Sequence, residues 1–238
     1  MSTKTRVTPG SAGDELVDLR IFLLLHRALR RDFAALAQAI GRADAPARRD
    51  RALASCARTT LWRLEHHHHG EDAKVWPLLR AKAPQSAALL DALESEHQQL
   101  DRLVADARAA LEVTGARHGQ PRTDGRDQAA AAWAALSSAL GGHLDKEERE
   151  VLPLLGQRVT AAEWKPLEKY FIRTLGPRRL LAYIPWLSSA AGTQERKQLL
   201  RAQPAAFRVI EALTRPWYAR RRLRLGLPDV LPAPSVRP

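Results

Sequence analysis

Four histidines stand at positions that a helical periodicity assigns to a buried face, and two of them precede a glutamate by four residues. The two pairs are His67–Glu71 and His143–Glu147. Residues i and i+4 lie on the same face of a helix, so each glutamate is expected to point inward with its histidine. An isolated carboxylate is very costly to bury, so this arrangement requires a compensating positive charge. The residues concerned are His26, His67, Glu71, His97, His143 and Glu147.

Metal ions supply such a charge, and a donor set of imidazole and carboxylate suits iron, zinc or manganese. Two carboxylates that bridge predict two ions rather than one. A single histidine in a core is more often a structural residue, but four aligned histidines with two glutamates favour a metal site. Two neighbours are further candidate ligands: His68 follows His67, and Glu148 would replace Glu147 if the helix register differed by one residue.

An internal repeat surrounds the two pairs. The segment HHHGEDAKVWPLL at 67–79 aligns without a gap with HLDKEEREVLPLL at 143–155. The alignment matches His67 with His143, Glu71 with Glu147, Asp72 with Glu148 and Pro77 with Pro153. The chain therefore divides into two helix–helix halves, and a two-fold-related pair of half-sites is a natural way to hold two metal ions.

Four long segments must position these residues. Apolar side chains recur every three or four residues along each segment, which predicts helices packed in a bundle. The predicted helices span residues 14–41, 47–82, 85–116 and 126–157, and each carries one of the four histidines. The short connections favour an all-α, up-down-up-down four-helix bundle. Pro77 and Pro153 are expected to kink or end the second and fourth helices.

These motifs resemble the hemerythrin family, in its bacterial hemerythrin-like (HHE cation-binding) branch, and the C-terminal region resembles the tails of long actinobacterial forms. The resemblance covers residues 14–157 and is carried by His26, by His67-His68-His69-Gly70-Glu71, by Glu96-His97 and by the segment from His143 to Glu148. It implies a non-haem di-iron site in the bundle, with the four histidines as terminal ligands and the two glutamates as bridges. It also implies a protein that binds or reacts with O2, NO or peroxide.

One position departs from the family pattern. Hemerythrins that carry oxygen place two histidines four residues apart on the third helix, and here Leu93 and Asp101 stand four residues before and after His97. His68, Glu94 or Asp101 would have to replace the missing imidazole. A donor set with fewer histidines leaves more open coordination, which favours redox reactivity over reversible oxygen carriage. Two alternatives stay open: a di-iron oxidase or catalase-like enzyme, and an interaction protein that uses its basic C-terminal helices on a membrane or nucleic acid, with the metal serving structure.

The composition fits this fold. Of 238 residues, 45% are hydrophobic and only 5% aromatic, which argues against a β-sandwich or barrel. The single cysteine, Cys56, excludes a disulfide scaffold and a zinc site made of cysteines. No apolar run is long enough to span a membrane, and the first residues contain no apolar core of a secretory signal. We therefore expect a cytoplasmic protein.

Outside the bundle, we predict a flexible leader at 1–13, a helical basic extension at 160–226 and a Pro-rich tail at 227–238. Five prolines are expected to divide the extension into short helices: Pro166, Pro177, Pro185, Pro204 and Pro216. The extension is expected to pack across one end of the bundle through Trp164, Phe171, Trp186, Phe207 and Trp217.

The positive charge is concentrated near the C-terminus. The chain carries 38 Lys and Arg against 26 Asp and Glu, a net charge of +12, and residues 171–238 account for 13 of the basic and 3 of the acidic residues. Aromatic and leucine residues interleave with the arginines from Arg215 to Arg224. A charge run of this kind is most often a solvated helix face, but the interleaved apolar residues also permit docking on an anionic membrane surface or nucleic acid. No helix-turn-helix or RNA-recognition signature accompanies it, so no specific nucleic acid partner is predicted.

Overall fold

The computed structural model describes residues 15–42, 47–116 and 122–227. Within these ranges all regular secondary structure is helical, apart from one isolated antiparallel bridge between Leu16 and Thr160. The predicted all-α fold is confirmed. The predicted leader at 1–13 lies outside the described residues, as does the predicted tail beyond residue 227.

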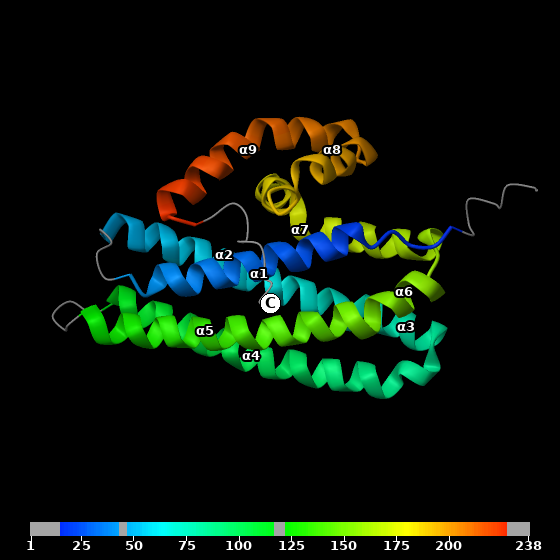
Figure 1. Cartoon of the computed structure of the whole chain (residues 1–238), viewed down its shortest axis with the longest axis horizontal. Coiled ribbons are helices and arrows are strands. Elements are labelled where there is room, and N and C mark those ends of the chain that lie inside the picture. Colours follow the sequence, from blue (N-terminus) through cyan, green and yellow to red (C-terminus); the bar gives the residue numbers. More distant parts are fainter. Residues whose placement is uncertain (1–14, 43–46, 117–121, 228–238) are drawn as a thin grey trace, which may run out of the picture.

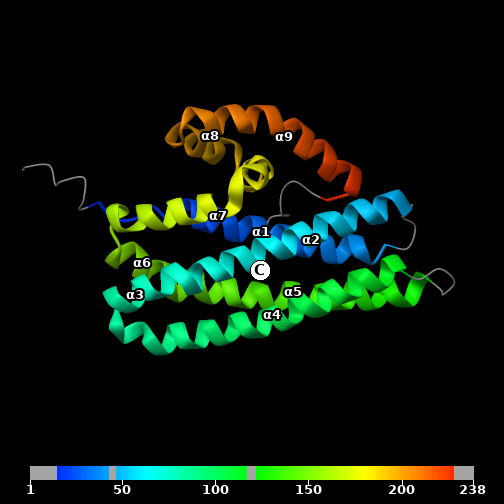
Figure 2. The same ribbon diagram turned by 180° about the vertical axis from the view of Figure 1, so that it is seen from behind.

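Four antiparallel rods run side by side and form the predicted up-down-up-down bundle (Figures 1 and 2). The second and fourth rods are each interrupted by one π-helical turn. In chain order the elements are α1 (Arg20–Ile40), α2 (Ala47–Gly70), a π turn (Glu71–Val75), α3 (Trp76–Lys82), a 3₁₀ turn (Pro84–Ser86), α4 (Ala87–Ala116), α5 (Arg122–Lys146), a second π turn (Glu147–Val151) and α6 (Leu152–Arg158).

The two π turns explain why the prolines of the repeat do not end their helices. Each turn begins at a glutamate of the repeat, Glu71 or Glu147, and is followed after one residue by Pro77 or Pro153. Proline cannot donate to the carbonyl four residues earlier, and its ring crowds that carbonyl. The wider π turn accommodates this mismatch locally. The rods therefore continue as α3 and α6.

The first rod begins later than predicted, at Arg20 rather than at residue 14. Backbone groups of the preceding residues pair instead with the segment that leaves α6. The amide of Val17 donates to the carbonyl of Val159 at 3.0 Å, and the amide of Ala161 donates to the carbonyl of Glu15 at 2.7 Å. Hydrogen bonds with a segment so distant in the chain compete successfully with a further helical turn.

The core consists of two apolar clusters with a polar layer between them. One cluster includes Leu29, Phe33 and Trp133, and the other includes Phe22, Trp76 and Leu93. Along each rod the candidate histidine or glutamate positions fall between residues of the two clusters. The layer is thus closed by apolar side chains above and below, and it lies deep inside the bundle.

The helices of the C-terminal extension are longer than predicted. It comprises α7 (Ala161–Ser188), α8 (Thr193–Ala202) and α9 (Ala205–Leu225). The expectation that every proline divides the extension is wrong, because Pro166, Pro185 and Pro216 lie inside helices. Two prolines coincide with breaks: Pro204 stands between α8 and α9, and Pro177 follows Gly176, which adopts φ 70° and ψ 160°. A positive φ of this kind is readily available to glycine alone.

The extension also packs differently from the prediction. Instead of crossing one end of the bundle, α8 and α9 lie over α1 and α2, on the side away from α4 and α5 (Figures 1 and 2). Trp164 and Trp186 are buried as expected, whereas Trp217 is 57% exposed and takes no part in this packing. The outer face of α9 is therefore not used to attach the extension.

A buried ion network attaches the extension to the first two rods. Asp32 of α1 accepts hydrogen bonds from Arg31 at 2.9 Å, from Arg222 at 2.7 Å and from the Trp186 indole at 2.8 Å. Burial raises the pKa of Asp32, but the guanidinium groups of Arg31, Arg222 and Arg63 outweigh it and hold the pKa below its usual range. The carboxylate is therefore charged at neutral pH and joins α1 directly to α7 and α9.

Gly70 allows α7 to pack closely on the end of α2. A Cβ atom at this position would lie 1.9 Å from Cε1 of Phe171, whereas a Cβ atom on Gly141 in α5 would meet nothing within 4 Å. We predict that Gly70→Ala lowers the free energy of unfolding by about 1–3 kcal/mol through overpacking. Gly141→Ala is the matched control and is expected to raise it by about 0.5–1 kcal/mol.

Urea denaturation followed by circular dichroism measures both changes. Adding Phe171→Ala to Gly70→Ala is expected to recover part of the loss, because it removes the atoms that the new methyl group meets. Equal stabilities of Gly70→Ala and Gly141→Ala would contradict the close approach of Phe171 to α2.

Candidate metal centre

The six residues singled out in the sequence lie together in the polar layer. His26 comes from α1, His67 from α2, His97 from α4 and His143 from α5, while Glu71 and Glu147 begin the two π turns. All six side chains belong to residues that are at most 4% exposed. Their nitrogen and oxygen atoms form two neighbouring groups: His26, His67, Glu71 and Glu147 in the first, and His68, His97 and His143 in the second.

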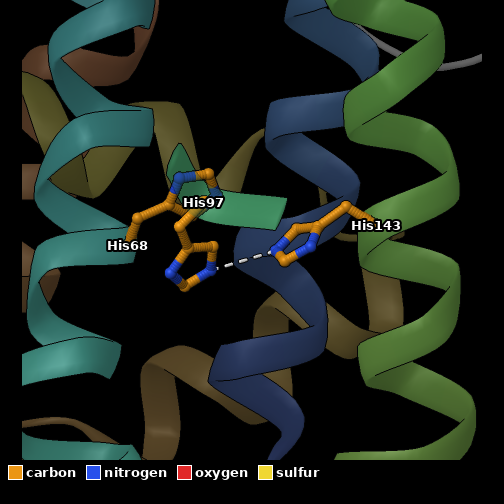
Figure 3. Close-up of side chains that lie close together, drawn as sticks. All are labelled: His68, His97 and His143. Carbon is orange, nitrogen blue, oxygen red and sulfur yellow. Dashed lines mark hydrogen bonds between the residues drawn. The ribbon is translucent and has the colours of Figure 1, made fainter. Parts of the chain in front are cut away.

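His68 lies beside His97 and His143, inside the cluster. It is 4% exposed, and its ring stacks on that of His97 with centroids 4.1 Å apart. Figure 3 shows the rings of His68, His97 and His143 converging from separate helices. Leu93 instead packs in the apolar core, and Glu94 pairs with Arg80 at 3.0 Å. Of the three residues suggested as replacements, the structure brings His68 into the cluster.

The two glutamates lie between the two groups of histidines. One oxygen of Glu147 is 3.4 Å from Nε2 of His26, and the other is 3.1 Å from Nε2 of His143. One oxygen of Glu71 is 3.4 Å from Nε2 of His67, and the other is 3.7 Å from Nε2 of His97. Each carboxylate thus presents one oxygen to each group, which is the arrangement of a bridging ligand.

Three outer carboxylates orient the histidine rings. The Nδ1 atoms of His26, His97 and His143 lie 2.9, 2.7 and 2.9 Å from oxygens of Glu148, Asp72 and Glu96, respectively. A ring that donates Nδ1–H to a carboxylate carries its lone pair on Nε2. These Nε2 atoms point into the cluster, where the pairs His26–His67 and His97–His143 approach within 3.2 and 3.1 Å. Lone pairs so close together need a proton or a cation between them.

Glu148 was predicted as an alternative ligand, and the structure places it behind His26 rather than in either group. Its partner in the repeat, Asp72, makes the corresponding contact with His97. Aligning the two halves of the repeat predicts this equivalence, but not which histidine each carboxylate reaches, because the contacts cross between halves. Glu96 belongs to the Glu96-His97 motif, but nothing in the sequence predicts that it contacts His143.

The buried carboxylates of Glu71 and Glu147 are suited to hold a cation, because no hydrogen bond satisfies their oxygens. All four oxygens of Glu71 and Glu147, together with Nε2 of His68, are buried without a hydrogen bond. Such groups are strongly destabilising unless a charge or a proton compensates them. The donor set of neutral imidazole and bridging carboxylate is one that iron, zinc and manganese accept. The residues present therefore fit a metal centre, and their roles as individual ligands stay predictions.

The pKa shifts describe how protons balance the charges of these side chains. Burial, with neighbouring histidines, lowers the pKa of His67 and His68 well below the ordinary value, so these rings are neutral. Burial lowers the pKa of His97, but its hydrogen bond to Asp72 and the nearby charge of Glu147 outweigh burial and raise the pKa to about 9. Burial and the nearby Glu147 raise the pKa of Glu71 well above its usual range. Protons thus neutralise the cluster, and a metal ion would displace them.

The fold and this donor set define a class: a four-helix-bundle protein with a candidate metal-binding site of clustered histidine and carboxylate side chains. Residues 17–155 match the hemerythrin HHE cation binding domain, and the chain belongs to that family. Searches of curated proteins and of solved structures found no match. Among the described residues, no helix is both long enough and apolar enough to cross a bilayer.

The contact between Asp72 and His97 generates a prediction about metal affinity. Replacing Asp72 by asparagine removes the charge that supports the His97 ring, so we expect affinity for Fe(II) to fall by about 10- to 100-fold. Competition with a chromogenic chelator under anaerobic conditions measures the change. Asp106→Asn, at an exposed position of α4, the helix that carries His97, is the matched control. Equal affinities of the two variants would show that Asp72 does not act through His97.

Proposed function

We propose that this protein is a non-haem di-iron protein that binds or reacts with O2, NO or peroxide inside the bundle. The observation that carries the proposal is the position of Glu71 and Glu147, each with one oxygen toward each group of histidines. Two shared carboxylates suit two ions better than one. When bound, iron supplies affinity for small diatomic ligands and redox chemistry with them.

The two groups differ in the number of donors that they offer. The first has four: two histidines and one oxygen from each glutamate. The second has five, because three histidines are joined there by the other oxygen of Glu71 and of Glu147. The first group therefore leaves more room for an added ligand, and we place small-molecule binding there.

The surroundings of the first group limit what can bind. The Phe22 ring packs edge-on against His26 and His67, with ring centroids 4.9 and 5.3 Å away. Phe22 and the apolar clusters exclude water from the Nε2 atoms, which strengthens electrostatic interactions at the site. A diatomic ligand or peroxide fits this confined space better than an organic substrate does.

The presence of His68 favours binding over turnover. The expectation of redox reactivity relied on a donor set short of one imidazole, and His68 lies where it supplies that imidazole. We therefore rank a carrier or sensor above an oxidase or catalase-like enzyme. No described carboxylate other than the two bridging candidates reaches an Nε2 atom of the cluster, so no separate proton donor stands out at the site.

Metal content tests this proposal. Full-length protein as isolated is expected to hold two irons per chain by elemental analysis, with a near-ultraviolet charge-transfer band that bleaches on reduction. Glu147→Gln is expected to lose at least one iron, because its oxygens face both groups, whereas Glu65→Gln, at a residue that pairs with Arg108 outside the cluster, is expected to keep both. Folded protein that holds no metal, or a single zinc, would overturn the di-iron assignment.

A second measurement separates binding from turnover. The reduced protein is exposed to O2, NO or hydrogen peroxide while its spectrum and the ligand concentration are followed. A stoichiometric and reversible spectral change is the result expected of a carrier or sensor. Continuous consumption of O2 or peroxide beyond one equivalent would instead favour the enzyme.

A further inference from the structure

A cavity of about 430 Å³ lies between the bundle and the C-terminal extension. Its walls come from α1, α2, α7 and α8, with Phe207 contributed by α9. Cavities of roughly 300–1,000 Å³ are typical of sites for small organic molecules. Most of the wall belongs to the extension, so the bundle alone would not form this cavity.

The wall is apolar and carries no basic residue. Its surface is made mainly of leucine, isoleucine and aromatic side chains, and none of its lining residues is Lys or Arg in a chain that has 38 of them. The charged residues that do line it are the acids Asp18 and Glu168. Burial raises the pKa of Glu168. This wall therefore disfavours an anionic ligand such as a fatty acid carboxylate and favours an uncharged one.

The cavity adjoins the first group of the candidate metal centre. His67 lines the cavity and also belongs to that group. Phe22 lines it as well, and the Phe22 ring contacts those of His26 and His67. Next to them, His66 lines the cavity and is held by a 2.8 Å hydrogen bond between its Nε2 and the hydroxyl of Thr174. A molecule in the cavity would therefore contact Phe22 and His67 and lie directly beside the first group of the cluster.

We propose that this cavity binds an uncharged, mainly apolar organic molecule of roughly 10–20 non-hydrogen atoms, seated between α8 and the Phe22–His67 wall. Such a ligand differs from the diatomic molecules of the proposed function. Its binding does not require the metal, so the two proposals can fail separately. Occupancy of the cavity would fix Phe22 and His67 and so influence access to the centre.

The neutral fluorophore N-phenyl-1-naphthylamine, excited directly, tests the proposal on the full-length protein with and without its metal. We expect saturable one-site binding that Leu199→Trp or Ile172→Trp, from two different walls, weakens by about tenfold or more through filling of the cavity. Leu213→Trp, on the exposed face of α9, is the matched control and is expected to leave binding unchanged. Thermal unfolding verifies that each variant is folded.

The anionic fluorophore 8-anilinonaphthalene-1-sulfonate provides the charge test, and we expect it to bind more weakly than the neutral probe. The proposal is overturned if the neutral probe does not saturate, if both folded cavity variants bind it like the control, or if the anionic probe binds as tightly.

A separate observation concerns the outer face of α9. Val209, Leu213, Trp217 and Leu223 are between 57% and 80% exposed, although all are large and apolar. At 100° per residue they lie within roughly a third of the helix circumference, together with the exposed Arg220 and Arg224. The opposite side of the helix is held to the bundle through Tyr218, Arg222 and Leu225.

The charges on α9 complement an anionic partner. The helix contains a single acidic residue, Glu211, which is buried and pairs with Arg196 at 3.1 Å. The exposed face therefore carries arginine and apolar side chains without an acid. Tryptophan and leucine on a helix with a basic face are typical of segments that lie in the interface of a membrane with anionic lipids.

We infer that α9 docks this protein on the surface of an anionic lipid bilayer. Co-sedimentation of the full-length protein with vesicles of phosphatidylcholine, with and without about 30% phosphatidylglycerol, tests this. Binding is expected only to the anionic vesicles, with a loss at high salt. Trp217→Ala with Leu223→Ala is expected to weaken it severalfold, whereas Leu181→Ala, an exposed apolar position on α7, is expected to have no effect.

Three outcomes would overturn the inference. They are no binding to anionic vesicles, equal binding to both vesicle types, and binding that the α9 double variant leaves intact. Tighter binding to an oligonucleotide than to the anionic vesicles, insensitive to Trp217→Ala, would assign the basic face to nucleic acid instead.

Discussion

The rest of this bundle depends on two buried carboxylates, those of Glu71 and Glu147. They have no hydrogen-bond partner and lie between two apolar clusters. Leaving Glu71 and Glu147 charged in such a place without compensation would cost more than typical folding stability allows. Protons shared with the histidines are one compensation, and the raised pKa of Glu71 and of His97 reflects it. A pair of cations is the other. The five imidazoles, their orientation and the outer carboxylates all follow from the need to hold positive charge at this one level of the core.

The two-fold pattern of the chain is a direct consequence of that need. Each half supplies a histidine, a glutamate at the start of a π turn, and an acidic residue directly after it. That last residue supports a histidine of the other half, since Asp72 reaches His97 and Glu148 reaches His26. The crossed contacts mean that neither half completes its own ligand environment. Lys146 behind Glu96 and Arg30 behind Glu148 extend the pattern outward and keep these supporting acids charged.

The sequence predicts the bundle and the inner residues well because both depend on local spacing. Helical periodicity places the six residues on inward faces, and the i, i+4 relation pairs His67 with Glu71. Residue spacing cannot predict contacts between segments that are distant in the chain. The residues before α1 pair with Val159, and the additional imidazole in the cluster is His68 from α2 rather than a neighbour of His97 along the chain. Likewise, spacing does not show which prolines end a helix: Pro166, Pro185 and Pro216 lie inside helices, whereas α7 breaks at Gly176, next to Pro177.

The extension is attached through the same two rods that carry His26 and His67. Asp32 of α1 accepts hydrogen bonds from Trp186 of α7 and Arg222 of α9. The guanidinium group of Arg63 in α2 stacks on the Trp186 ring, 4.2 Å from its centroid. Phe171 of α7 meets α2 at Gly70, the residue that directly precedes Glu71. Breaking a buried ion network costs several kcal/mol, so the extension cannot detach without disturbing these rods. Since the rods also position the first group of histidines, the extension forms one wall of the cavity that adjoins the candidate centre.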